Sequence, residues 1–399
     1  MPYKELFTLE DIDLKKRRVF LRADYDVPVS DEGKILDDFR IKESLPTIKK
    51  IFQKGASQII IGAHLGRPEN NEKKYSMDEV AKRLFKLSGR KVEKMRDCID
   101  LDDYLPDSKE CSIVLLENLR FHKEEEENNY EFAEKLAKLA DVYVNDAFAT
   151  CHREHASMHA ITKFLPGGIG LKVEQELKIF DSINDPDRPF VAILGGAKLE
   201  TKLPVIMNLI NKADTILLGG AMIFTFYKAR GLSVGKSIYS KEYVMNAKIL
   251  GNNEKIILPT DVVVADSSLN PGHVLTVTPD KIPSYLAGLD VGEKSLLEFK
   301  QKILEAKLVV WNGPLGYYEN KLFAKSTEEL LKFLAEHGEI KTIIGGGDTA
   351  KIVNDLKLQN KFYHVSTGGG AGLILLEGKE LIALEELKKN TEIFKKEGK

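Results

Sequence analysis

The first half of the chain alternates short apolar runs with amphipathic segments. The apolar runs predict buried strands at 19–29, 57–63, 112–120 and 141–148. Apolar residues at helical spacing predict helices at 39–54, 78–88 and 130–140, the first two of which end at Gly55 and Gly89. This alternation is typical of βαβ units, in which helices cover both faces of a parallel sheet.

The second half repeats the alternation, and most of its strands end in glycines. Strands together with the turns that end them are expected at 190–197, 215–222, 255–265, 308–316, 342–349 and 363–372. The clearest unit is 341–356, where three glycines end an apolar run, and Asp348 and Thr349 open a segment with helical spacing. Glycines let the backbone approach a phosphate closely, and the positive end of a helix attracts anions. We therefore predict a phosphate site here, with Asp348 as a ligand of the Mg²⁺ that accompanies a nucleotide.

The best candidate for a domain boundary is a helical run between two flexible segments. Glycines at 167–170 precede the run, and a turn with prolines at 184–189 follows it. A chain of 399 residues is also too long for one ordinary core. We predict an α/β protein with two doubly wound (Rossmann-like) domains that have parallel sheets and are joined by a hinge helix across a cleft. The expected limits are 1–170, 171–184 for the interdomain helix, and 185–384.

Composition excludes several classes of partner. Lys and Arg (59) balance Asp and Glu (61), so no overall field favours nucleic acid or an anionic membrane. No apolar stretch is long enough to span a bilayer, and the N-terminus lacks a signal-peptide pattern. Cys98, Cys111 and Cys151 form neither a close pair nor an even framework, as expected in a reducing compartment. We expect a cytoplasmic protein that binds neither nucleic acid nor membrane.

Polar side chains with cationic or hydrogen-bonding groups follow the strands of the first half. They are Asp24, Asp26, Arg40, His64, Arg67, Arg120 and Arg153. The carboxyl ends of parallel strands converge on one ligand crevice, and arginine binds phosphate and carboxylate bidentately. This half is therefore predicted to bind a small, multiply anionic metabolite. The alternative for each single arginine is a solvated surface charge.

Residues of the second half leave two enzyme classes open. Lys198 and Lys202 follow a glycine-rich strand end, and Pro204, which fits only the first turn of a helix, places both at or before its positive end. The run 345–350 matches the dinucleotide fingerprint G-x-G-x-x-A, which favours an NAD-dependent oxidoreductase of a small phosphorylated acid. Against this, glycines end the next strand where an acid for the ribose would be expected. These residues alone support kinase and dehydrogenase about equally, and binding of nucleotide without catalysis is a third possibility.

Eight motifs occur in an order and spacing that are together highly specific. They are LRADYDVP (21–28), HLGRP (64–68), ENLRF (117–121), NDAFATCHREH (145–155), LGGAK (194–198), WNGPLG (311–316), GGGDT (345–349) and STGGGAG (366–372). On these motifs the chain resembles the phosphoglycerate kinase family over nearly its whole length. The resemblance implies a monomeric, hinge-bending glycolytic kinase that reversibly transfers the acyl phosphate of 1,3-bisphosphoglycerate to ADP, giving 3-phosphoglycerate and ATP, with Mg²⁺. The N-terminal domain would bind phosphoglycerate and the C-terminal domain the nucleotide.

The resemblance also implies residue roles. The phosphoglycerate ligands would be Asp24, Tyr25, Asp26, Arg40, His64, Leu65, Gly66, Arg67, Arg120 and Arg153. The nucleotide ligands would be Gly195, Gly196, Lys198, Lys202, Gly288, Asn312, Glu319, Gly346, Gly347, Asp348 and Thr349, with Asp348 also on the metal. Residues acting on the transferring phosphoryl group would be Arg40, Lys198, Lys202 and Gly369.

The implied chemistry agrees with these residue types. The leaving carboxylate and the attacking phosphate oxygen need no proton transfer, so the enzyme must align oxygens and neutralise charge. Two departures from the family stand out. Asp26 replaces the usual Asn, which puts a carboxylate beside an anionic substrate. The family's Pro-Gly turn is replaced at 381–384, so we expect the tail 385–399 to be one continuous amphipathic helix that packs back on the N-terminal domain.

Overall fold

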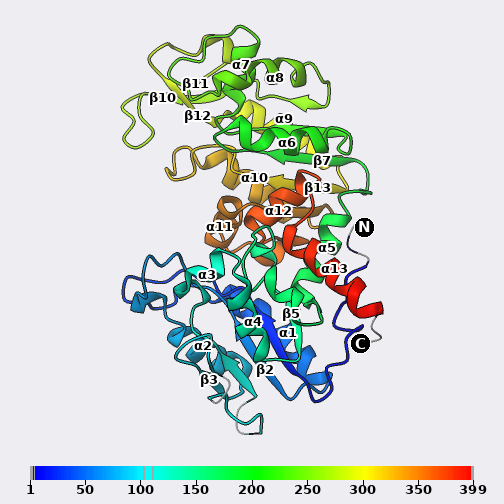
Figure 1. The fold of residues 1–399 in the computed structure, drawn as a ribbon. Helices are drawn as coiled ribbons and strands as arrows, with labels where there is room; N and C mark the ends of the chain where they lie inside the picture. The colour runs from blue at the N-terminus through cyan, green and yellow to red at the C-terminus, as the bar shows by residue number, and fades with distance from the viewer. Residues whose placement is uncertain (1–2, 4, 102–103, 110–111, 397–399) are drawn as a thin grey trace. The chain divides into compact units, whose positions relative to one another are not determined.

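The computed structural model describes residues 3, 5–101, 104–109 and 112–396. Its backbone divides into two units (Figure 1). Unit 1 comprises Met1–Lys178 and Glu380–Lys399, and unit 2 comprises Ile179–Lys379. The division falls within one helix, α5 (Leu171–Asp181). Of the three cysteines, Cys111 lies outside the described residues.

Unit 1 is built on a six-stranded sheet with the order β3-β4-β2-β1-β5-β6, and all its pairs are parallel. Its strands are β1 (Arg18–Arg22), β2 (Gln58–Gly62), β3 (Val92–Lys94), β4 (Ile113–Leu115), β5 (Val142–Asn145) and β6 (Gly167–Ile169). The residues of β2, β4 and β5 are buried throughout, as expected where helices cover both faces. The four predicted strands and their parallel arrangement are confirmed, whereas the short β3 and β6 were not predicted.

The predicted helices of unit 1 are present, and the first two end at the predicted glycines. They are α1 (Phe39–Gln53), α2 (Asp78–Ser88), α3 (Lys123–Glu126), α4 (Tyr130–Lys138) and α13 (Ile382–Lys396), with 3₁₀ turns η1 (Lys73–Tyr75), η2 (Leu119–Phe121), η3 (Phe148–Thr150) and η4 (Ala160–Lys163). Gly89 ends α2 in a left-handed conformation with φ of 65°.

The tail of the chain is helical and makes polar contacts with unit 1. The helix α13 begins at Ile382, a few residues earlier than expected. The Asn390 amide donates to the carbonyl oxygens of Thr162 (2.5 Å) and Leu165 (2.7 Å) and accepts from the Gly167 N–H (3.0 Å). These bonds satisfy backbone groups of the segment that leads from η4 into β6.

Unit 2 has a parallel sheet with the order β15-β14-β13-β7-β8-β9. Its strands are β7 (Phe190–Leu194), β8 (Thr215–Leu218), β9 (Ile256–Ile257), β13 (Leu308–Asn312), β14 (Lys341–Gly345) and β15 (His364–Val365). Numbered along the chain from β7, this is the Rossmann order 3-2-1-4-5-6, which reverses direction between β7 and β13. Ligands of such sheets bind beyond the carboxyl ends of the strands at this switch point.

The helices of unit 2 connect these strands. They are α6 (Leu199–Leu209), α7 (Ile223–Ala229), α8 (Val244–Leu250), α9 (Glu293–Leu304), α10 (Lys325–Glu336), α11 (Gly347–Asp355) and α12 (Gly369–Leu376), with 3₁₀ turns η5 (Lys241–Tyr243), η6 (Pro279–Lys281) and η7 (Gln359–Lys361). The placement of Pro204 in a first turn was wrong. Because α6 begins at Leu199, Pro204 lies in the second turn, and Lys202 still lies in the first.

A small antiparallel sheet in unit 2 was not predicted. Its order is β11-β10-β12, with β10 (Val262–Ala265) between β11 (Val274–Val277) and β12 (Ala287–Val291). The expected single strand 255–265 is therefore two strands in two sheets, separated by Pro259, which cannot donate to a ladder.

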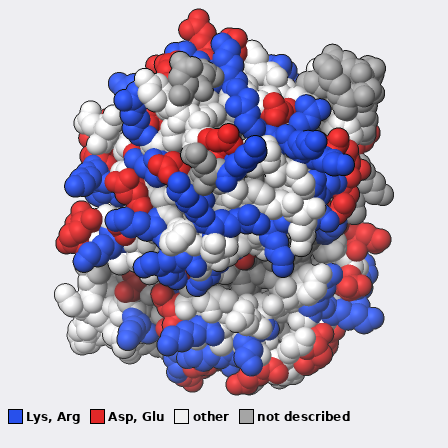
Figure 2. Space-filling view, turned by 90° about the horizontal axis from the view of Figure 1, so that it is seen from below, with Lys and Arg blue, Asp and Glu red and all other residues white. Residues whose placement is uncertain are grey.

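The surface carries charges of both signs. Figure 2 shows Lys and Arg side chains intermingled with Asp and Glu on one face, in keeping with a formal net charge of −2. Within the described part of the chain, no helix has the length and apolar character needed to cross a membrane.

Candidate active site

Unit 1 brings a carboxylate and an arginine together where β1 ends. Asp24 lies two residues beyond β1, and Arg40 is the second residue of α1. Arg40 Nη1 lies 2.5 Å from Asp24 Oδ2, and the Arg40 side chain keeps 30% of its surface exposed. Asp24 thus holds the guanidinium in place while part of it stays available to an anion.

His64 and Asp26 form the next part of this group. His64 Nε2 lies 3.7 Å from Asp26 Oδ2, and Asp26 Oδ1 accepts the Gly66 N–H at 2.8 Å. Burial alone would raise the pKa of Asp26, but the nearby His64 ring, the Gly66 N–H hydrogen bond and the charge of Arg40 outweigh it, so the pKa falls below its usual range. Asp26 is therefore a charged carboxylate among cations.

Arg22, the last residue of β1, orients His64. Its side chain is fully buried, and Nη2 lies 3.0 Å from His64 Nδ1. A guanidinium only donates, so His64 Nδ1 must accept and the ring proton lies on Nε2, facing Asp26. Burial lowers the pKa of His64 to about 4; Asp26 opposes this shift, while the charges of Arg22 and Arg120 add to it. His64 is thus a neutral donor at pH 7.

A buried network holds Arg22 in turn. Arg22 Nε donates to Ser157 Oγ (2.8 Å), and Nη2 lies 4.0 Å from Glu125 Oε1. Glu125 is fully buried and accepts from the Ser157 hydroxyl (2.6 Å) and N–H (2.9 Å). Arg22 was not among the predicted site residues. Its position at the end of a buried strand was the available signal, since a buried arginine requires partners.

Asn118 fixes the turn that carries Arg120. Its side-chain oxygen accepts from the N–H groups of Arg120 (3.1 Å) and Leu65 (3.2 Å), which ties η2 to the segment after β2. Arg120 Nη1 donates to the Gly66 carbonyl at 2.7 Å. Gly66 has φ of 65°, and a Cβ there would overlap the Tyr75 ring, so this approach requires glycine. Asn118, inside the quoted ENLRF motif, was also missed.

The remaining predicted site residues of unit 1 differ in how far their side chains are buried. Arg153 is half-buried and electrostatically coupled to Arg120, whereas Arg67 is exposed. The side chains of Tyr25 and Leu65 belong to the core, and the Tyr25 hydroxyl lies 3.0 Å from Ser44 Oγ. Only the backbone of these two residues is in a position to contact a ligand. The segment 152–159, which contains Arg153, has turns and irregular backbone.

In unit 2, Lys202 lies at the switch point between β7 and β13. Its ammonium donates to Asn312 Oδ1 at the end of β13, and the Gly195 N–H beyond β7 donates to the Asn312 carbonyl (3.0 Å). Burial lowers the pKa of Lys202 to about 8, against the opposing charges of Asp348 and Glu377. Lys198 is exposed and immediately precedes α6. The two lysines thus lie at the positive end of a helix.

The N-terminus of α11 adjoins Lys202. Gly346 has φ of 90°, which favours glycine, and Gly347 begins the helix. Asp348 is exposed, and the Tyr318 hydroxyl donates to its Oδ1 at 3.0 Å. Partial burial and Asp348 raise the pKa of Tyr318 to about 12, so the hydroxyl stays a donor. Tyr318 was not predicted, although it adjoins Glu319, which was.

Thr349 and Gly369 are the last two predicted site residues that follow strands of unit 2. Thr349 is fully buried, and its hydroxyl accepts the Gly313 N–H at 3.0 Å. Gly369 is the first residue of α12, so its backbone N–H lies at the start of a helix. Backbone N–H groups at the starts of α11 and α12 are unpaired within their own helices, as in anion sites.

A cavity of about 440 Å³ opens beside these groups, within unit 2. This volume suits a small organic ligand. The residues that line it include Gly196, Phe224, Gly288, Leu289, Leu315, Tyr318, Glu319 and Asp348. Residues predicted to bind the nucleotide thus line one cavity together with apolar side chains. Gly288 lies so close to the Phe224 ring that a Cβ would overlap it, which explains the need for glycine on this wall.

The dinucleotide fingerprint is misplaced for a dehydrogenase. In the Rossmann fold it lies in the turn after the first strand of the order, where β7 stands. Here the match at 345–350 follows β14, the fifth strand. The turn after β7 instead contains Gly195, Gly196 and Lys198, and Lys202 follows in the first turn of α6.

Comparisons with known proteins identify the family. The family model described as phosphoglycerate kinase matches residues 9–379. A phosphoglycerate kinase of Dictyoglomus turgidum is 44% identical over 389 residues, covering 96% of this chain and 98% of its own. The cytosolic phosphoglycerate kinase of Triticum aestivum is 46% identical over 396 residues, covering 95% and 98%.

Comparison with solved structures gives the same family. The structure of phosphoglycerate kinase from Coxiella burnetii has a TM-score of 0.86 at 34% identity, covering 96% of this chain and 99% of its own. None of these relatives supports the alternative of an NAD-dependent oxidoreductase. This chain therefore belongs to the phosphoglycerate kinase family, glycolytic kinases that transfer a phosphoryl group to or from a carboxyl group.

Proposed function

We propose that this chain transfers the acyl phosphate of 1,3-bisphosphoglycerate to ADP and catalyses the reverse reaction with 3-phosphoglycerate and ATP. The observation that carries the proposal is Lys202 beside the α11 N-terminus at the Rossmann switch point, with an arginine-rich anion group in the other unit. The first arrangement suits a polyphosphate and the second a small phosphorylated acid.

In unit 1, phosphate and carboxylate of the substrate would bind cations whose positions are already fixed. Arg40 is held by Asp24, and Arg120 by the Gly66 carbonyl. His64 would donate its Nε2 proton as a neutral group. Arg67 and Arg153, the less constrained cations, would complete the ligand set. Preset cations lose little side-chain entropy on binding, which favours affinity.

In unit 2, charge on the transferring group would be neutralised by Lys198, Lys202 and the starts of α11 and α12. The adenosine would occupy the 440 Å³ cavity, with Glu319 near its ribose. Gly369 would bring its backbone N–H to the reacting phosphate. Since neither oxygen needs proton transfer, alignment and charge neutralisation suffice for catalysis.

The residues fit a magnesium ion. Mg²⁺ is commonly held by one or two carboxylates together with substrate phosphates, and Asp348 is an exposed carboxylate beside Lys202. Tyr318 occupies one oxygen of Asp348 and leaves the other available. When bound with the nucleotide, Mg²⁺ would offset the negative charge of the phosphates.

Three further expectations belong to this proposal. The segment 171–184, which contains α5, acts as the hinge between an N-terminal domain with its C-terminal tail and a C-terminal domain. The protein is a monomer. It is cytoplasmic; the Triticum aestivum relative is named as a cytosolic enzyme, whereas two relatives from Arabidopsis thaliana are named chloroplastic.

The proposal is tested by ATP consumption with 3-phosphoglycerate and Mg²⁺, coupled to NADH oxidation through glyceraldehyde-3-phosphate dehydrogenase. Each substrate is omitted in turn. Turnover that needs both substrates supports the proposal. Folded protein that binds MgATP but does not turn over with 3-phosphoglycerate would refute the assignment of unit 1.

Asp26→Asn is expected to lower the KM for 3-phosphoglycerate several-fold. The change removes one negative charge beside an anionic substrate, worth about 1 kcal/mol near a protein surface, while the amide oxygen still accepts from Gly66. Steady-state kinetics measure the effect, with the KM for ATP unchanged. The exposed Asp31→Asn is the matched control. An unchanged or higher KM would show that the carboxylate does not oppose binding.

Tyr318→Phe is expected to change the affinity for Mg²⁺ in the presence of ADP by about three- to tenfold, the net contribution of an ordinary hydrogen bond, because this bond is exposed to water. The direction is tighter binding, because the hydroxyl competes with the metal for Asp348. Manganese electron paramagnetic resonance or calorimetry measures it directly. Tyr317→Phe, which lines the same cavity, is the control. Equal metal affinities in Tyr318→Phe and the unsubstituted protein would count against this competition.

A further inference from the structure

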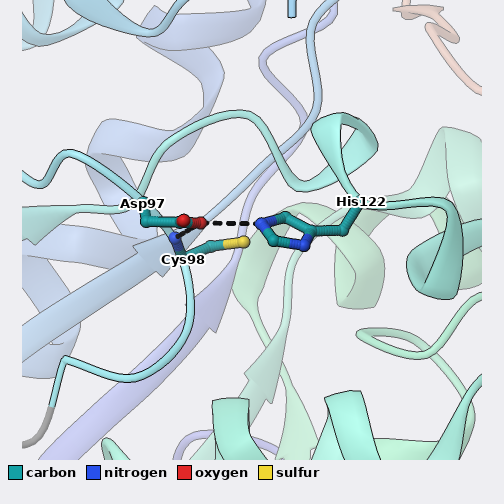
Figure 3. A group of neighbouring side chains, drawn as sticks. All are labelled: Asp97, Cys98 and His122. Carbon is teal, nitrogen blue, oxygen red and sulfur yellow. Dashed lines mark hydrogen bonds and ion pairs between the residues drawn. The ribbon is translucent and has the colours of Figure 1, made fainter. Parts of the chain in front are cut away.

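A cluster of three different ligand types lies outside the groups assigned above. Asp97 and Cys98 follow β3, and His122 follows η2. Figure 3 shows the three side chains facing one another. Asp97 Oδ1 lies 2.7 Å from His122 Nε2, and one ligand atom from each of the three residues lies within 4.8 Å of the others.

The surroundings of the thiol are acidic. Cys98 is fully buried, and burial together with the carboxylates of Asp97, Glu125 and Glu117 raises its pKa. Much of the charge of Glu117 is offset by Lys94, and Glu125 is held by Ser157, whereas Asp97 accepts from His122 and from the Cys98 N–H. A cation entering between Asp97 and the sulfur would meet a favourable field and would stabilise the thiolate.

We propose that Asp97, Cys98 and His122 form a binding site for a soft divalent transition-metal ion such as Zn²⁺. Carboxylate oxygen, thiolate sulfur and imidazole nitrogen are the donors that zinc prefers. On binding, the thiol releases its proton to solvent, and the Asp97–His122 hydrogen bond is replaced by two metal bonds. The side chains of Asp97 and His122 are 46% and 23% exposed, so water can reach a fourth position.

This site differs in chemistry from that of Asp348. Mg²⁺ prefers oxygen ligands and would not select a thiolate, whereas the Cys98 set selects softer ions. Its position also matters. His122 lies two residues from Arg120, and its ring packs on Phe132 at 5.3 Å between centroids. A bound ion would therefore cross-link the segment after β3 to the turn that carries Arg120.

Cobalt(II) alone is the probe for this site. Full-length protein stripped with a chelator, without nucleotide or phosphoglycerate, is titrated with Co²⁺. The expected result is one equivalent of a thiolate-to-cobalt charge-transfer absorption, which Zn²⁺ then bleaches. Loss of the band is expected in Cys98→Ser and in His122→Phe, whereas Cys111→Ser and Cys151→Ser retain it.

Far-UV circular dichroism verifies the fold of each variant before metal is added. His122→Phe keeps the thiol, so it remains decisive if Cys98→Ser does not fold. A band of equal strength in either variant would overturn the proposal. So would the absence of any cobalt–thiolate band in the unsubstituted protein at saturating Co²⁺.

Discussion

Arg22→Met is expected to destabilise unit 1 by about 3–5 kcal/mol, the cost of removing one partner of a buried ion pair. Methionine replaces most of the apolar volume, so the loss is mainly electrostatic. Glu125 would remain fully buried and keep the two hydrogen bonds of Ser157, but it would lose the charge of Arg22, so its already raised pKa would rise further. Denaturant unfolding followed by circular dichroism measures the change.

Two features of the chain locate the effect of Arg22→Met. The single tryptophan, Trp311, lies in β13 of unit 2, so its fluorescence reports the other unit. Ellipticity should be lost at a lower denaturant concentration than the fluorescence changes. The double variant Arg22→Met/Glu125→Gln is the matched control, because it removes the unpaired charge as well.

The same variant should weaken phosphoglycerate binding. Without the Arg22 donor, His64 Nδ1 is free to take up the ring proton, and the Nε2 proton that faces Asp26 is no longer fixed. A higher KM for 3-phosphoglycerate, with an unchanged KM for ATP, is the expected kinetic signature. Stability equal to that of the unsubstituted protein would show that the ion pair, at 4.0 Å, contributes nothing.

Local sequence signals were sufficient for much of the fold. Gly55 and Gly89 end α1 and α2 where the apolar spacing stops, because both adopt positive φ that other residues avoid. Continuous runs of Val, Ile and Leu identified the central strands of both parallel sheets. These features depend on the residues of the segment itself.

Features fixed by distant partners were not predictable in this way. The strand β10 belongs to the small antiparallel sheet and not to the parallel one. Just before β10, Asp261 accepts a hydrogen bond from the Ser295 N–H (2.8 Å) at the start of α9. No periodicity in 255–265 shows a partner that lies more than thirty residues away. The edge strand β3 has only three residues of mixed exposure, which makes its pattern indistinguishable from a loop.

The residues of the candidate site likewise fall into those that local sequence indicates and those that depend on distant partners. Charged residues at strand ends were recognisable, because few physical reasons other than a ligand place them there. Arg22, Asn118 and Tyr318 act through other side chains, and their partners come from different elements. Glu319, next to Tyr318, was predicted, and so were Asp24 and Arg120, two residues from Arg22 and Asn118, but which residue of such a segment makes the supporting contact is decided by packing.

Lys202→Ala is expected to lower kcat by roughly 30- to 900-fold, which corresponds to about 2–4 kcal/mol of transition-state stabilisation. The ammonium lies beside the start of α11 in a largely water-excluded position, where neither solvent nor Asn312 can replace its charge. Initial rates at saturating MgATP and 3-phosphoglycerate measure the loss. Lys248→Ala, an exposed lysine in α8 of the same unit, is the control.

The pH profile separates the charge of Lys202 from its volume. Burial lowers the pKa of Lys202 to about 8, so in the free enzyme the cation is present at pH 7 and is lost as the pH rises through 8. The value of kcat/KM, which reports ionisations of the free enzyme, should therefore fall above pH 8. In Lys202→Ala this descending limb should disappear, and in Lys202→Arg it should move beyond the measurable range, because a guanidinium stays charged. A limb near pH 8 that persists in both variants would assign the ionisation to another group. A near-normal kcat for Lys202→Ala would remove the residue from the chemical step.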